Sequence, residues 1–359
     1  MMQDLQDIQF IKKEGGSQDS DGERSAGSTE RTAACTGRKK KNPNRWLIIV
    51  IVLLAAVILT GILEYWLISS SGTNYGGGDT YVAVLHVEGT IQSSGSASSQ
   101  DSYQHDWQLA RVDELMQDRN NRGLLLYVNS PGGAVYQSDE LYLKLKEYKE
   151  KTGRPFYVYF AETAASGAYY ISAGADYICA NRNTQTGSIG VYMGPVISAE
   201  EFLDRLGIKA DIIKSGENKA VGSGYEDMTD EQRAIYQSLV DEMYGRFVSI
   251  VAEGRGMSEE RVRELGDGRV YTAQQALENG LIDKVCTYEE AILYMREEEN
   301  LKCSFVSISY APKQSLLSTL LGLQESVDAP EEQDSASEAE SVMKLIEEYS
   351  HPQFYYKIP

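Results

Sequence analysis

The sequence predicts an α/β domain in which helices cover both faces of a sheet. Short apolar runs that fit buried strands alternate along the chain with segments that fit helices, and this alternation implies βαβ crossovers. Glycine-containing turns follow several of the expected strands, as they do at the carboxyl edge of such sheets. We expect strands at 81–91, 123–130, 156–160 and 177–180, and helices at 108–119, 138–151, 165–173 and 200–206.

The first half of this pattern depends on apolar runs bounded by turns. The segment YVAVLHVEGTI ends at a glycine turn, and GLLLYVNS, FYVYF and YICA are almost continuously apolar, which is typical of strands buried on both faces. Residues 138–151 interleave leucine with charge, and residues 165–173 are rich in small side chains. Both segments therefore predict helices that pack against the sheet.

The second half of the domain is predicted to be mainly helical. A long amphipathic helix is expected at 229–254, a shorter one at 258–265 and a third at 272–279. Thr272 is the expected N-cap of the third helix, and Gly280 is expected to end it.

The composition limits the kinds of partner. The 359 residues include 34 Lys and Arg against 53 Asp and Glu, for a formal net charge of −19. This acidity argues against a general affinity for nucleic acid. The four cysteines show no CxxC spacing, so neither a zinc ribbon nor a disulfide framework is expected. They are Cys35, Cys179, Cys286 and Cys303.

A membrane anchor is predicted near the N-terminus. Residues 1–45 are polar and fit a disordered cytoplasmic arm, whereas residues 46–68 are mainly apolar, with Glu64 as the one charge. A transmembrane helix over 46–68 is long enough to cross the hydrocarbon core of a bilayer. A cleavable signal peptide is the alternative, but the apolar segment lies far from Met1 and is longer than a typical signal-peptide core.

Basic residues give the expected orientation of this anchor. Five of them stand just before the span: Arg38, Lys39, Lys40, Lys41 and Arg45. The positive-inside rule therefore places the N-terminus in the cytoplasm. A Gly- and Ser-rich linker over 69–79 then leads to an extracytoplasmic domain over 80–310. We expect a single-pass protein of the cell membrane.

Residues 311–359 are expected to form an acidic, flexible C-terminal tail. Residues 325–348 contain nine acidic residues and one lysine, whereas the last nine residues, HPQFYYKIP, are aromatic. One hypothesis is that this end reaches an active site, either as an inhibitory segment or as a segment that is trimmed. The alternative is an exposed end with no role.

Three glycine-containing turns are candidate ligand sites. They are NSPGGAV at 129–135, AASGAYY at 164–170 and QTGSIG at 185–190. A Pro-Gly-Gly turn leaves backbone amides free and lets another chain approach closely, as in an oxyanion hole. A tight strand-to-helix turn without any ligand is the alternative.

Ser166 is the candidate nucleophile. It is expected at the start of a helix that follows a strand, where free amides surround its hydroxyl. An ordinary N-cap serine fits the same place. The surrounding residues, Ala-Ala-Ser-Gly-Ala, do not match the G-x-S-x-G elbow of α/β-hydrolases.

A serine nucleophile needs a base, and none of the three histidines is well placed to act as one. His86 lies within the first strand, His105 in a polar loop and His351 in the tail. A lysine is therefore the expected base, as in Ser-Lys variants of the catalytic triad. Such a lysine has to lose its proton near neutral pH, which burial beside apolar or cationic groups favours.

Six motifs in a fixed order carry a more specific resemblance. They are VAVLHVEGTI, LLLYVNSPGGAV, AETAASGAYYISAGADYI, TGSIGVYMG, IIKSGENKAVGS and GDGRVYTAQQALENGLID. In this order they resemble the signal peptide peptidase family of the SppA type, in its short membrane-anchored form, over about residues 80–300. The resemblance implies a crotonase/Clp-protease-like α/β fold and hydrolysis of peptides by a serine/lysine dyad.

The resemblance also implies roles for five residues. Ser166 matches the nucleophile, Lys219 the general base, and Ser188 the serine that hydrogen-bonds the lysine amine. Gly133 and Gly167 match the backbone donors of the oxyanion hole. The implied substrates are remnant signal peptides and other short or unfolded peptides. The short form is expected to be a homo-oligomer in which neighbouring subunits share active sites.

Two nearby lysines, Lys209 and Lys214, do not match the family base. No metal or cofactor is implied, and the sequence has no Walker-type nucleotide motif. Two alternatives remain open: a crotonase-like acyl-CoA enzyme, which has the same fold and a similar oxyanion hole, and an inactive scaffold that binds peptides. Hydrolysis of a fluorogenic peptide separates all three.

Overall fold

The computed structural model describes residues 49–55, 58–59, 77–94, 103–310 and 354–357. The chain divides into two compact units, Met1–Gly72 and Thr73–Pro359. In the first unit, 49–55 and 58–59 are helical, and the rest of the predicted arm and span lies outside the described residues. Among the residues that are described, no helix combines the length and apolar character needed to cross a membrane.

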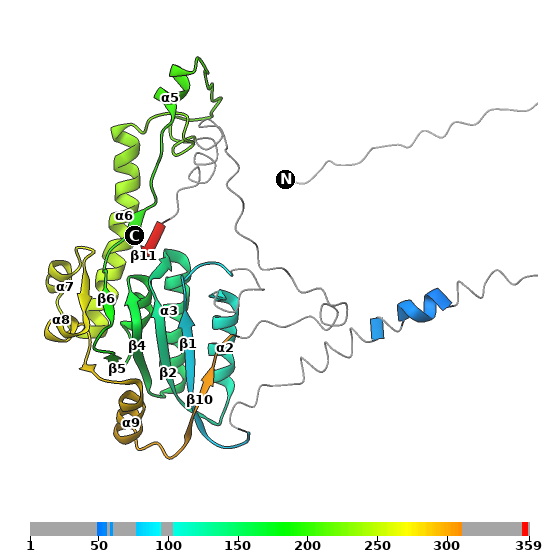
Figure 1. Ribbon diagram of the computed structural model, residues 1–359, viewed down its shortest axis with the longest axis vertical. Coiled ribbons are helices and arrows are strands. Elements are labelled where there is room, and N and C mark those ends of the chain that lie inside the picture. Colours follow the sequence, from blue (N-terminus) through cyan, green and yellow to red (C-terminus); the bar gives the residue numbers. More distant parts are fainter. Residues whose placement is uncertain (1–48, 56–57, 60–76, 95–102, 311–353, 358–359) are drawn as a thin grey trace, which may run out of the picture. The chain divides into compact units, whose positions relative to one another are not determined.

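The second unit is built around a mixed sheet, which confirms the predicted α/β class (Figure 1). Its strands are β1 (Tyr81–Glu88), β2 (Asn121–Ser130), β4 (Phe156–Ala165), β5 (Tyr177–Ala180), β6 (Gln185–Gly187), β8 (Val270–Thr272), β9 (Lys284–Val285) and β10 (Ser304–Ile308). The main path runs β10-β1-β2-β4-β5-β9, and every neighbouring pair on it is parallel. β6 extends the sheet beside β4 in parallel, and β8 joins β6 in antiparallel.

The predicted helices are present, with their ends shifted by a few residues. In the described part of this unit the helices are α2 (His105–Gln117), α3 (Val135–Thr152), α4 (Gly167–Ser172), α5 (Glu200–Arg205), α6 (Asp230–Arg255), α7 (Glu259–Leu265), α8 (Ala273–Glu278) and α9 (Tyr288–Glu298). Thr272 caps α8, as predicted, through a capping box with Gln275. The sequence did not predict α9, although Thr287 and Glu290 form the same motif at its start.

Apolar side chains fill both faces of the sheet. On one face, Leu85 and Val87 of β1 belong to the core that includes α2, α3, α4 and α6. On the other face, Val84 packs in a second cluster with Ala291 and Met295 of α9. Because successive side chains of a strand point to opposite faces, one apolar strand supplies both cores. This arrangement explains why the strands are almost continuously apolar in sequence.

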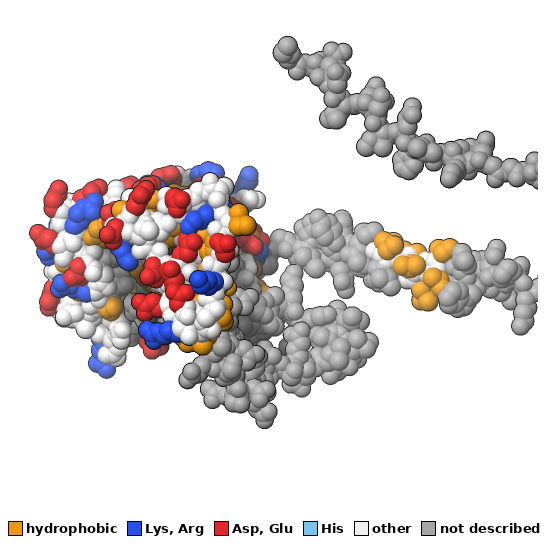
Figure 2. Space-filling model, turned by 90° about the horizontal axis from the view of Figure 1, so that it is seen from above, with side chains coloured by type: hydrophobic (Ala, Val, Ile, Leu, Met, Phe, Trp, Pro, Cys, Tyr) orange, Lys and Arg blue, Asp and Glu red, His pale blue; other side chains and the backbone are white. Residues whose placement is uncertain are grey.

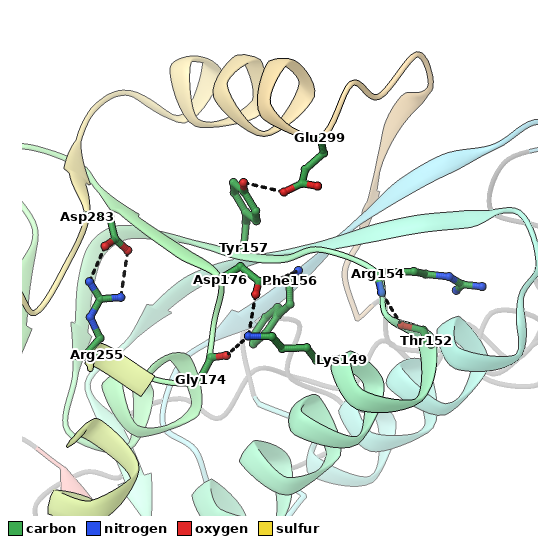
Figure 3. A network of polar contacts seen from close by, with 10 residues as sticks. All are labelled: Lys149, Thr152, Arg154, Phe156, Tyr157, Gly174, Asp176, Arg255, Asp283 and Glu299. Carbon is green, nitrogen blue, oxygen red and sulfur yellow. Dashed lines mark hydrogen bonds and ion pairs between the residues drawn. The ribbon is translucent and has the colours of Figure 1, made fainter. Parts of the chain in front are cut away.

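Polar contacts attach the helices to the strand ends (Figure 3). Arg255, at the end of α6, forms a two-point ion pair with Asp283 at 2.6 and 3.0 Å. Asp176 accepts a hydrogen bond from the Phe156 amide at 2.8 Å and forms an ion pair with Lys149 at 2.7 Å. These contacts fix α3 and α6 against the amino ends of β4, β5 and β9.

Acidic side chains are spread over the visible face of the second unit, with basic ones between them (Figure 2). Some form local ion pairs, such as Lys144 with Asp113 at 2.9 Å and with Glu147 at 3.0 Å. Exposed pairs of this kind contribute at most about 1 kcal/mol each to folding stability. The apolar cores therefore carry most of the stability of this unit.

A small second sheet joins the end of the chain to the domain. It consists of β3 (Gly132–Ala134), β11 (Phe354–Lys357) and β7 (Tyr192–Met193), with β11 in the middle and antiparallel to both neighbours. Composition predicted a flexible tail over 311–359. Of this tail, 311–353 lies outside the described residues, but β11 is a strand because two edges satisfy its backbone groups.

The structure corrects the expected position of His105. This residue begins α2 rather than lying in a polar loop, and it is only 4% exposed. Its Nδ1 lies 2.9 Å from the Tyr103 hydroxyl, and its Nε2 lies 2.8 Å from a Glu140 carboxylate oxygen. Since Glu140 belongs to α3, His105 connects two helices.

Candidate active site

Ser166 occupies a strained turn between β4 and α4. Its backbone angles are φ 55° and ψ −118°, a combination that residues with a side chain rarely adopt. Its amide donates a hydrogen bond to the Gly187 carbonyl at 2.7 Å, and its carbonyl accepts one from the Tyr170 amide at 2.8 Å. The sheet and the helix thus hold this turn from both sides.

The Ser166 hydroxyl does not cap α4. A serine at this position ordinarily accepts a hydrogen bond from a backbone amide of the first helical turn, but the side chain makes no such bond here. The N-cap interpretation of this serine therefore lacks its defining contact. A strained turn that places a serine between a strand and a helix is typical of nucleophiles.

The pairing of β6 with β4 brings Ser188 next to Ser166. The register pairs Ala165 with Gly187, the last residues of two adjacent parallel strands, and Ser166 and Ser188 are the residues that follow them. Ser188 also has a positive φ, 50°, and its amide donates to the Arg269 carbonyl at 2.8 Å. Both serines are almost fully buried. The structure thus brings two of the predicted site residues together.

The two predicted oxyanion glycines meet at the same place. A Cβ built on Gly167 would lie 3.1 Å from the Gly133 amide nitrogen, and a Cβ on Gly133 would lie 1.8 Å from the Ile91 carbonyl oxygen. Gly132, with φ 93°, makes the turn that precedes Gly133. Backbone amides that converge beside a candidate nucleophile fit an oxyanion hole.

The carbonyl oxygen of Tyr356 lies among these glycines. It would be 2.3 Å from a Cβ built on Gly132 and 3.0 Å from one built on Gly167. β11 places it there because Tyr356 pairs with Gly133 in the antiparallel register. The last strand of the chain thus places a backbone carbonyl beside Gly167, one of the two candidate oxyanion glycines.

Lys219 is not part of this cluster. It is exposed in the segment between α5 and α6, where its amide donates to the Gly216 carbonyl at 3.1 Å. Figure 1 shows this segment beside α5, at the end of α6 that is distant from the sheet. Within the described part of the chain, no contact joins Lys219 to Ser166 or Ser188. Lys214, in the same segment, pairs with Glu226 at 2.6 Å.

Ser138 is a site neighbour that the sequence did not reveal. It lies in the first turn of α3, it is fully buried, and its Oγ finds no hydrogen-bond partner among the described residues. That Oγ would be 2.4 Å from a Cβ built on Gly167. Its one sequence signal is its position five residues after the Pro-Gly-Gly turn. No group of three or more potential metal ligands occurs in the described ranges.

Comparison with known proteins identifies the class of this chain. The model of peptidase family S49 matches residues 148–302. A protein of Enterococcus faecium that carries the name signal peptide peptidase SppA is 37% identical over 249 residues, which cover 68% of this chain and 72% of that protein. The chain is therefore a hydrolase, a serine-type peptidase. It belongs to the signal peptide peptidase family of the SppA type.

The chain also resembles proteins that share a smaller part of its length. A protease of Synechocystis is 42% identical over 178 residues, 50% of this chain and 63% of that protein. Protease 4 of Haemophilus influenzae is 36% identical over 213 residues, and only 34% of that protein is covered. A solved structure of a membrane-bound stomatin-specific protease aligns with a TM-score of 0.41 at 14% identity, covering 65% of this chain and 100% of that chain.

Proposed function

We propose that this chain is a membrane-anchored serine endopeptidase with a Ser-Lys dyad. It degrades remnant signal peptides and other short or unfolded peptides outside the cytoplasmic membrane. The strained Ser166 turn, with Ser188 and the glycine amides beside it, is the observation that carries the proposal. The basic residues before the apolar segment 46–68 support the anchor and its orientation.

In the proposed mechanism, the neutral amine of Lys219 accepts the Ser166 proton while Oγ attacks a peptide carbonyl. The amides of Gly133 and Gly167 donate hydrogen bonds to the resulting oxyanion, and each donor stabilises the transition state by about 3 to 4 kcal/mol. The lysine then gives its proton to the leaving amine, and an acyl group remains on Ser166. Water, deprotonated by the same lysine, releases this acyl group. Ser188 orients the amine.

The lysine of each site comes from a neighbouring subunit. Ser166 is buried at the sheet, whereas Lys219 is exposed on a segment at the far end of α6. A homo-oligomer in which this segment reaches the serine of the next subunit completes every site. Exposed large apolar side chains on this segment and on α6 support such contacts. They are Leu206, Ile208, Ile213, Ile235 and Leu239.

Two substitutions test the dyad in the full-length protein. Ser166→Ala and Lys219→Ala should each lower the hydrolysis of a fluorogenic peptide by at least about a thousandfold, because each removes a group that acts in the chemical step. Lys209→Ala is the matched control, since it removes another exposed lysine upstream in the same segment and should leave the rate unchanged. Circular dichroism checks the fold of each variant.

The outcomes separate the candidate functions. Full activity in either dyad variant contradicts the assignment of that residue. A wild-type protein that binds peptides without cleaving them supports the inactive scaffold instead.

A further inference from the structure

The hydroxyl of Ser138 is buried without a hydrogen-bond partner. Ser138 lies in the first turn of α3 and is 0% exposed, and its Oγ makes no hydrogen bond to any residue that the structure describes. Burial of an unpaired hydroxyl lowers stability, because its hydrogen bonds to water are lost and not replaced. Since buried polar groups in folded proteins are usually paired, this exception requires an explanation.

Ser138 Oγ faces the candidate oxyanion glycines. A Cβ built on Gly167 would lie 2.4 Å from this oxygen, 3.0 Å from the Tyr356 carbonyl oxygen and 3.1 Å from the Gly133 amide nitrogen. The hydroxyl, a peptide carbonyl and a candidate oxyanion amide therefore surround one point beside Gly167. Because Gly167 has no Cβ, it places no side chain between the hydroxyl and the carbonyl.

A contact between α3 and α4 holds Ser138 in this position. The next residue of α3, Asp139, accepts a hydrogen bond of 2.5 Å from the Tyr170 hydroxyl of α4. Since Gly167 is the first residue of α4, this bond joins the helix that carries Ser138 to the helix that carries Gly167. A group that packed helices hold in place needs little reorganisation when it acts in catalysis.

A serine hydroxyl can donate to the negative charge that develops during peptide hydrolysis. When Ser166 Oγ bonds to a peptide carbonyl carbon, the π electron pair of the carbonyl moves to its oxygen, which becomes an oxyanion. The hydroxyl proton of a serine rotates to suit its acceptor, and a hydrogen bond to a charged oxygen is about twice as strong as one to a neutral oxygen. A donor that pairs only with the oxyanion stabilises the transition state and not the bound substrate, so it raises kcat.

We propose that the Ser138 hydroxyl is a third donor of the oxyanion hole, beside the amides of Gly133 and Gly167. It is unpaired in the resting site, and it pairs with the oxyanion when the tetrahedral intermediate forms. Ser138 is thus a catalytic residue, and its burial exchanges stability for rate. This inference rests on the proposed peptidase function, with Ser166 as its nucleophile.

Ser138→Ala in the full-length enzyme tests this role, because it removes the hydroxyl and keeps the Cβ. We expect kcat for a fluorogenic peptide to fall by about 10- to 100-fold and KM to change by less than about twofold, since one transition-state donor is lost. The melting temperature should rise by about 2 to 4 °C, because an unpaired buried hydroxyl is removed. A residue that only packs the core would not combine a slower reaction with a more stable fold.

Ser172→Ala is the matched control. Ser172 is also 0% exposed, but its Oγ donates a hydrogen bond to the Ala168 carbonyl at 2.7 Å within α4. This variant loses one buried hydroxyl from the same region of the fold, and it should keep the wild-type kcat.

A peptide aldehyde measures stabilisation of the oxyanion separately from the rate. Addition of Ser166 Oγ to the aldehyde carbon gives a tetrahedral adduct, and such transition-state analogues depend on the same groups as the reaction itself. Ser138→Ala should therefore raise the inhibition constant of the aldehyde by about the factor by which kcat/KM falls. Ser172→Ala should leave this constant unchanged.

The possible failures differ. If Ser138→Ala keeps the wild-type kcat, if its melting temperature falls, or if it binds the aldehyde as tightly as the wild type, Ser138 is not an oxyanion donor while the peptidase function stands. If the wild-type enzyme hydrolyses the peptide no faster than Ser166→Ala does, the proposed function fails and this inference fails with it.

Discussion

At three glycines around Ser166 the structure leaves no room for a side chain. A Cβ on Gly132 would lie 2.6 Å from the Gly167 nitrogen, one on Gly133 1.8 Å from the Ile91 oxygen, and one on Gly167 2.4 Å from the Ser138 oxygen. Because real Cβ atoms do not approach other atoms so closely, any larger residue here would displace its neighbours, and with them the amides. Oxyanion stabilisation depends on the placement of such donors within about 0.5 Å.

Gly133→Ala should therefore lower kcat for peptide hydrolysis by at least about 100-fold. It should also lower the free energy of unfolding by about 1 to 3 kcal/mol. Gly245→Ala is the control. A Cβ on Gly245 meets nothing within 4 Å, and alanine favours the α6 helix by about 0.5 to 1 kcal/mol. Steady-state kinetics and thermal unfolding measure both effects. A wild-type kcat for Gly133→Ala would show that the Gly133 amide is not an oxyanion donor.

The sequence motifs predicted Ser166, Ser188, Gly133 and Gly167 as site residues. The structure brings all four to one place. Ser188 lies beside Ser166 because β6 pairs with β4, for example Gly187 with Ala165, and this pairing of residues 22 positions apart has no local signal. The sequence did not reveal Ser138, or the packing of Tyr356 against Tyr170 and Phe247, for the same reason. Their positions depend on how α3, α4 and α6 pack, which periodicity does not define.

The longer strands and helices could be predicted because their signals are local. Apolar runs mark β1, β2, β4 and β5, and amphipathic segments mark α3 and α6. β3, β7 and β11 have two to four residues each, too few for a periodic pattern, and they form only because they pair with one another. The composition of the tail therefore gave no indication that its last residues form a strand.

Removal of β11 should activate the enzyme towards added peptides. The tail holds β11 in the slot between β3 and β7, and an attached competitor acts at a high effective concentration. Deletion of residues 354–359 should raise kcat/KM by about tenfold, and Tyr356→Ala should act in the same direction because it removes the ring that packs against Tyr170 and Phe247. Fluorogenic-peptide kinetics measure both variants.

The intact mass of the purified protein shows whether the chain cleaves its own tail. If the site cleaves its own tail after Tyr356, wild-type protein should lack Lys357 to Pro359, whereas Ser166→Ala should retain them. If both proteins keep Pro359, there is no self-trimming and β11 acts only as a competitor. Equal activity of the full-length and truncated enzymes would show that β11 does not occupy the slot in solution.

Lys219 and Ser166 lie apart within one chain, and this separation bears on how several chains assemble. The described chain positions a strained serine, a second serine and the proposed oxyanion amides, but it leaves Lys219 exposed on a segment beside α5. The proposed Ser-Lys dyad requires that Lys219 reach Ser166. A second subunit that supplies its lysine satisfies this requirement without refolding the chain. Sequence alone could not decide this, because Lys219 follows Ser166 by 53 positions, a separation that allows either arrangement.

Co-assembly of two inactive variants tests whether the serine and the lysine meet across subunits. In oligomers formed from equal amounts of Ser166→Ala and Lys219→Ala chains, an intact serine faces an intact lysine at about one quarter of the sites. Peptide hydrolysis should then return to about a quarter of the wild-type rate, although each variant alone is inactive. Mixed oligomers are verified by two affinity tags. No recovery of activity in verified mixed oligomers would contradict the shared site and place both residues of each dyad on one chain.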